Sequence, residues 1–223
     1  MKKTFLKSGL LAIAGIALMA GSASAGMIYA DSAYWYNPDG TLRAQSDGLL
    51  NGDLREDPDN ALGAYDGDFL SLGLGGAAVF SFAYPFDSQA SVVEVTWDNT
   101  GHHSEAANVY VWSQEDGLTF DQTYGQSGSN WEFVDAINNE PATPGSDTNT
   151  STLSLTSANL NAASPFLYLA IVDTTLPSDF SAGAAIDGFD IGSVSANVPE
   201  PATMMLFGAG LAGLAGIGRR RKK

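Results

Sequence analysis

The chain has no cysteine, and its central part has almost no basic residues. Without cysteine there can be no disulfide, so stability must come from a packed core, from bound metal, or from both. Of the ten Lys and Arg, three lie in residues 1–25 and five in 219–223, which leaves Arg43 and Arg55. All 25 Asp and Glu lie in residues 26–218, so this region carries 2 − 25 = −23. Such a polyanion repels nucleic acid, and we expect no nucleic-acid partner.

The familiar catalytic motifs are also missing. The sequence has no Gly-x-Ser-x-Gly elbow, no Gly-rich phosphate loop, no His-Glu-x-x-His helix and no cysteine nucleophile. A pair of carboxylates would be enough for glycoside hydrolysis, but spacing in the sequence does not show their separation in space. We therefore assign no catalytic residue and expect no enzyme. A secreted glycosidase is the less favoured alternative, which activity on chromogenic glycosides would support.

The N-terminal segment has the pattern of a secretory signal. Three lysines within residues 1–7 precede the apolar run GLLAIAGIALMAG, and Ala23 and Ala25 then supply the small residues that a signal peptidase needs. We therefore expect residues 1–25 to form a signal helix that signal peptidase removes before Gly26. This pattern predicts export.

The C-terminal segment combines two prolines, an apolar run and a basic end. As a helix, residues 204–218 would be about 22 Å long, which is short for a bilayer core of roughly 30 Å. Basic residues stay on the cytoplasmic side, so this segment is expected to stop export and hold the chain transiently in the inner membrane. The prolines around Glu200 keep the preceding strip extended and open to an enzyme. The basic stop signal consists of Arg219, Arg220, Arg221, Lys222 and Lys223.

This tail resembles the PEP-CTERM sorting signal of Gram-negative bacteria. The resemblance covers residues 198–223, with the sorting motif Val198, Pro199, Glu200 and Pro201, the span 204–218 and the basic end. It implies that the chain is a substrate of exosortase, which releases or re-attaches the exported part at the cell surface or in the extracellular matrix. It also implies an association with exopolysaccharide and biofilm. The alternative is a weak C-terminal membrane anchor with a proline linker.

The region between the two signals has the pattern of β-strands. Runs rich in Val, Phe, Tyr, Trp and Thr alternate apolar and polar residues and are separated by Gly, Asn, Asp, Ser and Pro clusters. No stretch indicates a long amphipathic helix. We expect an all-β fold, with one antiparallel β-sandwich of the jelly-roll type in residues 26–197. The predicted strand runs are AAVFSFAYPF, SVVEVTW, NVYVWS, TLSLTS, PFLYLAIVD and AIDGFDIGSVSA.

The central domain also resembles galactose-binding-like (discoidin-type) jelly rolls of bacterial surface proteins. The segment REDPDNALGAYDGDFLSLGLGG, followed by AAVFSFAYPF, is similar to the opening of these domains, and AIDGFDIGSV is similar to their final strand. The resemblance implies a binding or scaffold module, often with a structural calcium ion. A carbohydrate-binding module that recognises a defined glycan is therefore an alternative to a structural role in exopolysaccharide.

One acidic loop is a candidate calcium site. Calcium takes six to eight oxygen ligands in flexible geometry, which closely spaced carboxylates and loop carbonyls can supply. The alternative is a solvated acidic turn in a chain that is acidic throughout. The spacing is not that of an EF-hand. The candidate ligands are Asp57, Asp59, Asp66 and Asp68.

Aromatic residues are candidates for stacking on sugars. The run Tyr34, Trp35, Tyr36 and the separate Trp97, Trp112 and Trp131 are large enough for such a platform. In a sandwich, however, alternate aromatic residues of a strand usually fill the core between the sheets, and this is favoured for Trp97 and Trp112. Trp35 is the candidate for glycan stacking.

Overall fold

The computed structural model describes residues 26–43, 54–95, 104–113, 131–139, 147–156, 160, 165–179 and 188–198. Residues 27–198 belong to one compact unit. The expected signal helix, the apolar helix and the sorting motif beyond Val198 lie outside the described residues. None of the helices that the described residues form has the length and hydrophobicity needed to cross a membrane. The division into signal, domain and sorting segment stays a prediction.

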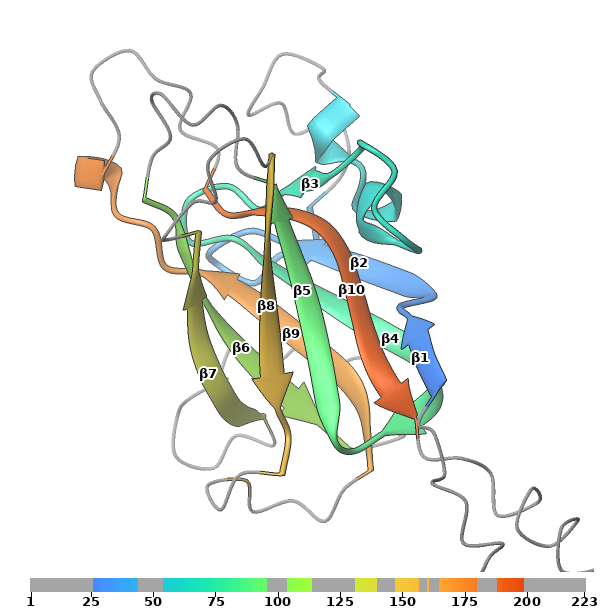
Figure 1. The fold of residues 1–223 in the computed structure, drawn as a ribbon. Coiled ribbons are helices and arrows are strands. Elements are labelled where there is room, and N and C mark those ends of the chain that lie inside the picture. Colours follow the sequence, from blue (N-terminus) through green and yellow to red (C-terminus); the bar gives the residue numbers. More distant parts are fainter. Residues whose placement is uncertain are drawn as a thin grey trace, which may run out of the picture. The chain divides into compact units, whose positions relative to one another are not determined.

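The described residues form two antiparallel sheets that face each other (Figure 1). One sheet has the strand order β1-β10-β5-β8, with β3 paired to β10, and the other has the order β2-β4-β9-β6-β7. The strands of the first sheet are β1 (Gly26–Tyr29), β3 (Leu70–Ser71), β5 (Gln89–Val95), β8 (Thr148–Ser154) and β10 (Asp190–Val198). Those of the second are β2 (Ser32–Tyr36), β4 (Ala77–Phe86), β6 (Ala106–Trp112), β7 (Glu132–Asn138) and β9 (Phe166–Asp173).

Three short 3₁₀ helices complete the elements of the described residues. They are η1 (Leu54–Glu56), η2 (Pro58–Ala61) and η3 (Pro177–Asp179). Pro58 stands at the start of η2, where its missing N–H costs no hydrogen bond. Asp57 caps this helix, because its side chain accepts a hydrogen bond from the Asp59 N–H.

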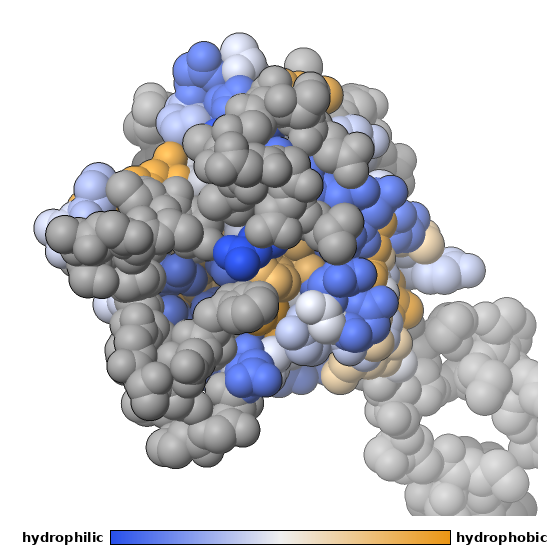
Figure 2. All heavy atoms as spheres, turned by 90° about the horizontal axis from the view of Figure 1, so that it is seen from above, coloured by the Kyte–Doolittle hydropathy of each residue, from blue (hydrophilic) through white to orange (hydrophobic). Residues whose placement is uncertain are grey.

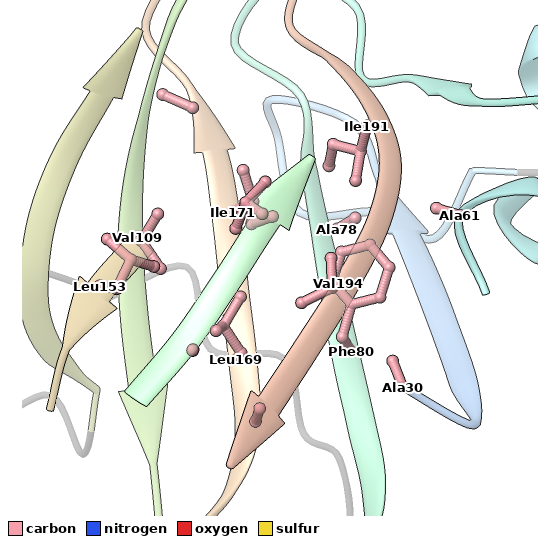
Figure 3. Close-up of a cluster of buried hydrophobic side chains, with 14 of the residues drawn as sticks. Ala30, Ala61, Ala78, Phe80, Val109, Leu153, Leu169, Ile171, Ile191 and Val194 are labelled. Carbon is pink, nitrogen blue, oxygen red and sulfur yellow. The ribbon is translucent and has the colours of Figure 1, made fainter. Parts of the chain in front are cut away.

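The core between the sheets follows from the alternation along each strand. In β5, Ala90 and Val92 point inward, and in β10 Val194 and Ala196 do the same. These small and branched side chains pack against Phe80 and similar residues of the second sheet, as Figure 3 shows. Burial of this apolar surface is the main stabilising contribution, at about 25 cal/mol per Å².

The expected all-β antiparallel sandwich is confirmed. The run AAVFSFAYPF is β4, and the runs expected around β5, β6, β8, β9 and β10 overlap these strands within a few residues at each end. Sequence periodicity did not indicate β1, β2, β3 or β7. Of these, β3 has only two residues and is held by its pairing with β10.

Candidate functional site

The four predicted calcium ligands fall into two pairs. In the first, the Asp57 Oδ1 accepts from the Asp59 N–H at 3.0 Å, and in the second the Asp66 Oδ1 accepts from the Asp68 N–H at 3.2 Å. Hydrogen bonds of this kind are typical of Asx turns and helix caps. One carboxylate oxygen of each pair therefore has a structural role in the loop.

The second pair lies beside a tyrosine that covers the first sheet. The Tyr65 ring rests directly on Gly192 of β10, because a Cβ there would come within 2.5 Å of the ring carbon Cδ2. Burial raises the pKa of the Tyr65 phenol, and the negative charges of Asp147, Asp66 and Asp68 raise it further. Asp147, just before β8, is thus a third acidic residue near this position, and its distance in sequence hid it from the sequence analysis.

As placed, the four predicted carboxylates do not form one ligand set. Within the described ranges, no three Asp, Glu or His side chains come together as a group able to hold a metal ion. Calcium binding by this loop therefore stays a prediction, and the geometry assigns one oxygen of Asp57 to a helix cap and one oxygen of Asp66 to a turn.

Trp35 lies in the core, with 2% of its surface exposed. Its indole N–H donates to the Leu72 carbonyl at 3.0 Å, and the Arg43 guanidinium lies 4.4 Å from the ring centroid. Arg43 also donates to the Leu72 carbonyl and to the Asn37 side chain. A ring enclosed in this way packs the sandwich, which favours core filling over sugar stacking at this position.

A second aromatic cluster covers the outer side of the β2-β4-β9-β6-β7 sheet. Val109 and Val111 of β6 face the core, so Tyr110 and Trp112 face outward. Trp112 packs against Trp131 with ring centroids 5.2 Å apart. Both tryptophans are buried. Core filling was expected for Trp112, and it is indeed buried, but on the outer face of its sheet instead of between the sheets.

Glu94 is a buried acid at the end of β5. It is 2% exposed, and neither carboxylate oxygen has a hydrogen-bond partner among the described residues. Burial raises the pKa of Glu94 to about 8, and the side chain of Asn139 only partly opposes this effect. The Asn139 amide oxygen accepts a hydrogen bond from the Glu105 N–H at 3.1 Å. The NH₂ group of Asn139 therefore remains for Glu94, but no hydrogen bond of ordinary geometry joins it to the Glu94 carboxylate. Glu94 is therefore neutral in the folded chain near pH 7.

Asp173 is a second buried acid, and its carboxylate, unlike that of Glu94, accepts several hydrogen bonds. It accepts hydrogen bonds from the Gly75 N–H at 2.7 Å, the Phe189 N–H at 2.9 Å and the Thr175 hydroxyl at 2.6 Å. Burial raises the pKa of Asp173 above its ordinary value, and these hydrogen bonds oppose the rise only in part. Figure 2 shows the molecule from above, and in this view hydrophobic residues lie between hydrophilic ones. Asp173 joins β9, the turn before β4 and the start of β10.

The predicted sorting residues begin where the last strand ends. Val198 is the final residue of β10, while Pro199, Glu200, Pro201 and the basic stop signal lie outside the described residues. Residues 197–222 match the family described as the PEP-CTERM protein-sorting motif. The resemblance of the tail is thus confirmed. The motif indicates export and sorting by an exosortase.

No curated protein matches the sequence. Among solved structures, the chain is similar to the CBM32 of AlyQ in complex with 4,5-unsaturated mannuronic acid, at 15% identity and TM-score 0.40, over 77% of this chain and 97% of that one. It is also similar to CpGH89CBM32-4 from Clostridium perfringens in complex with glcNAc-alpha-1,4-galactose, at 13% identity and TM-score 0.36, over 80% and 100% of the two chains. These TM-scores are below 0.5, so the likeness assigns no residue, ligand or activity to this chain.

Proposed function

We propose that this chain is an exported, non-enzymatic surface or extracellular matrix protein that has a structural or binding role in exopolysaccharide. The observation that carries the proposal is the sorting motif at residues 197–222, which begins in the last two residues of strand β10. The strongly acidic domain supports the proposal, since self-repulsion of like charges keeps an extracellular domain soluble.

The proposal predicts that Glu200 is needed for processing of the tail. In a Gram-negative host with an exosortase, the wild-type chain should lose its tail and appear at the surface or in the medium. A Glu200→Ala chain should keep the tail and remain in the inner-membrane fraction, because the strip that the enzyme recognises is changed. Immunoblots of membrane, surface and medium fractions measure the distribution.

Two control chains sharpen this test. Asp59→Ala removes an exposed carboxylate from the domain and should leave processing unchanged. Wild-type chain in a host that lacks the exosortase should stay in the membrane like Glu200→Ala. Equal processing of wild type and Glu200→Ala, with or without exosortase, would show that the tail is a simple anchor.

A further inference from the structure

Strand β8 is an edge strand of the first sheet. It lies beside β5 and, within the described chain, no strand pairs with its other side (Figure 1). The two strands pair without a register shift, from Gln89 and Ser154 at one end to Val95 and Thr148 at the other. An edge strand presents a row of backbone N–H and C=O groups that no neighbouring strand uses, so it is a template for pairing with another chain.

The register shows which backbone groups of β8 point away from β5. Just beyond the strand, the Leu155 N–H donates to the Ser88 carbonyl at 3.1 Å. Hydrogen bonding alternates along an antiparallel pair, so Thr150, Thr152 and Ser154 direct their N–H and C=O groups away from β5. These three residues are exposed. Outside the strand ladders, no backbone hydrogen bond joins them to another described residue.

Strand β7 of the second sheet lies behind β8 and does not cover its edge. Leu153 of β8 is in the core, and Asn149 points to the same side because side chains alternate along a strand. From that side, the Asn149 side chain donates to the Asn138 carbonyl of β7 at 3.3 Å. As far as the described residues show, the edge of β8 itself is therefore open.

The other edge strands of the described sheets have features that oppose such pairing. The outer side of β2 is partly occupied, since the Arg43 N–H donates to the Trp35 carbonyl at 2.8 Å. β7 contains Glu132 and Asp135 and has a register shift, and β1 has only four residues. Short, charged, irregular or covered edges are the usual protection against association. β8 has none of these features, because its seven residues TNTSTLS include no charge, proline or glycine.

We propose that β8 pairs antiparallel with β8 of a second copy of the chain, so that the first sheets of two domains join across a two-fold axis at Ser151. In this register Thr150 of each copy lies opposite Thr152 of the other, and the two residues exchange hydrogen bonds through their outward N–H and C=O groups. Threonine side chains that lie opposite each other also favour pairing of the strands. The contact uses the same edge of both copies, so it closes as a dimer.

The charge distribution favours this register. Residues 26–218 carry a charge of −23, so two copies need an uncharged contact surface, and β8 provides one. Asp147, just before the strand, lies opposite the uncharged Leu155 of the other copy. The two Asp147 residues are then 155 − 147 = 8 positions apart along the ladder, about 27 Å. This separation exceeds the Debye length of about 8 Å at physiological salt.

Because the chain has no cysteine, a single introduced thiol reports the contact. At the two-fold axis Ser151 meets itself in a non-hydrogen-bonded pair, where Cα atoms lie about 4.5 Å apart, a distance that a disulfide spans. The full-length Ser151→Cys chain, in detergent micelles that outnumber the chains, should form a disulfide dimer under mild oxidation, measured on non-reducing gels. The yield should rise when NaCl is raised from about 50 to about 500 mM, because salt screens the repulsion between the two acidic domains.

Two other single thiols serve as controls. Thr174→Cys, at an exposed position after β9, measures dimer formed by random collision. Ser154→Cys tests the register, because Ser154 lies opposite Thr148 of the other copy and its own counterpart is 154 − 148 = 6 positions away, about 20 Å. Both chains should give much less dimer than Ser151→Cys.

Proline variants in the Ser151→Cys chain separate backbone pairing from mere proximity. Thr152→Pro removes an N–H that points away from β5, so the domain should stay folded, as its thermal melt will show. The dimer yield should fall at least about tenfold, because each symmetric half of the contact loses a hydrogen bond. Thr150→Pro should have the same effect. Thr152→Val keeps the N–H and is the matched control, with a yield like that of Ser151→Cys alone.

The inference is overturned if Ser151→Cys gives no more dimer than Thr174→Cys or Ser154→Cys, or if folded Thr152→Pro and Thr150→Pro chains give as much dimer as Thr152→Val. A yield that falls as NaCl is raised would also overturn it, since that is the behaviour of an ion-paired contact. The comparison of the three single thiols needs no proline variant. None of these results changes the processing of the tail, so the proposed function is tested separately.

Discussion

At the scale of single residues, Glu94 couples the fold to pH. The ordinary pKa of this carboxyl is 4.5, and burial raises it to about 8 in the folded chain. Below pH 4.5 both the folded and the unfolded chain hold the proton, so Glu94 makes the free energy of unfolding no more dependent on pH there. Between pH 4.5 and about 8 the unfolded chain releases a proton that the folded chain retains. The free energy of unfolding therefore falls as pH rises through this window.

We predict that Glu94→Gln removes most of this pH dependence. The loss of stability between pH 4.5 and 8 is about 1.4 kcal/mol for each pH unit if Glu94 acts alone. Glutamine is neutral at every pH, so the variant should be more stable than wild type at pH 8 and similar to it at pH 4.5. Urea unfolding of the full chain at several pH values measures this difference.

The exposed Asp135 of β7 provides the control for Glu94. Asp135→Asn removes an exposed carboxyl and leaves the buried Glu94 in place. The pH dependence of its free energy of unfolding should therefore follow that of wild type. A wild-type stability that is flat from pH 5 to 8 would contradict a neutral, buried Glu94.

At the scale of elements, Asp173 holds three segments together. Its carboxylate bonds to the turn at Gly75, to Phe189 before β10, and to Thr175 after β9. Gly188 beside this junction has φ +71°, and a Cβ there would come within 2.7 Å of the Gly73 carbonyl carbon. The junction thus depends on one acid and on backbone that only glycine fits easily.

We predict that Asp173→Ala lowers the free energy of unfolding by roughly 2–5 kcal/mol, because the buried Phe189 N–H and the partly buried Gly75 N–H lose their acceptor. Thr174→Ala, at the exposed neighbouring position, should change it by less than about 0.5 kcal/mol. Chemical unfolding of the full chains measures both values. Equal effects of the two substitutions would show that the Asp173 bonds do not stabilise the junction.

The strands differ in how well the local sequence pattern predicts them. Long strands such as β4 and β9 bury apolar residues in continuous or alternating runs, so β-propensity and periodicity point to them. β7 has the pattern EFVDAIN with a register shift opposite Val109 and Tyr110, which breaks the alternation. β1 and β2 are short, and their pairing partners lie far away in the sequence. Local pattern cannot reveal such strands.

At the scale of the whole molecule, a bound ion would act on the stability of the entire fold. The calcium hypothesis predicts that millimolar Ca²⁺ raises the thermal midpoint of the full chain by several degrees over the value in EDTA, since a ligand held only by the folded state stabilises it by mass action. The increase should be lost in Asp57→Ala or Asp66→Ala. Differential scanning fluorimetry measures the midpoint.

Mg²⁺ at the same concentration is the control for this melt, since it screens charge equally but prefers a rigid octahedral site. An equal rise with Mg²⁺ would indicate screening of the acidic surface instead of a site. No rise with either ion would leave the loop with the turn and capping roles that Asp57 and Asp66 have in the structure.

The all-β class, the absence of disulfides, the strongly negative domain and the sorting motif follow from the amino-acid sequence alone, because composition and contiguous motifs need no information on contacts. Which aromatic side chains are buried, and on which face, became known only from the three-dimensional arrangement of the strands, as Trp35 and Trp112 show. The same arrangement also shows that the Glu94 carboxylate has no hydrogen-bond partner among the described residues, and that Ser91 pairs with both Thr152 and Ser195. These properties depend on strand order and register, which bring together residues that are far apart in the chain.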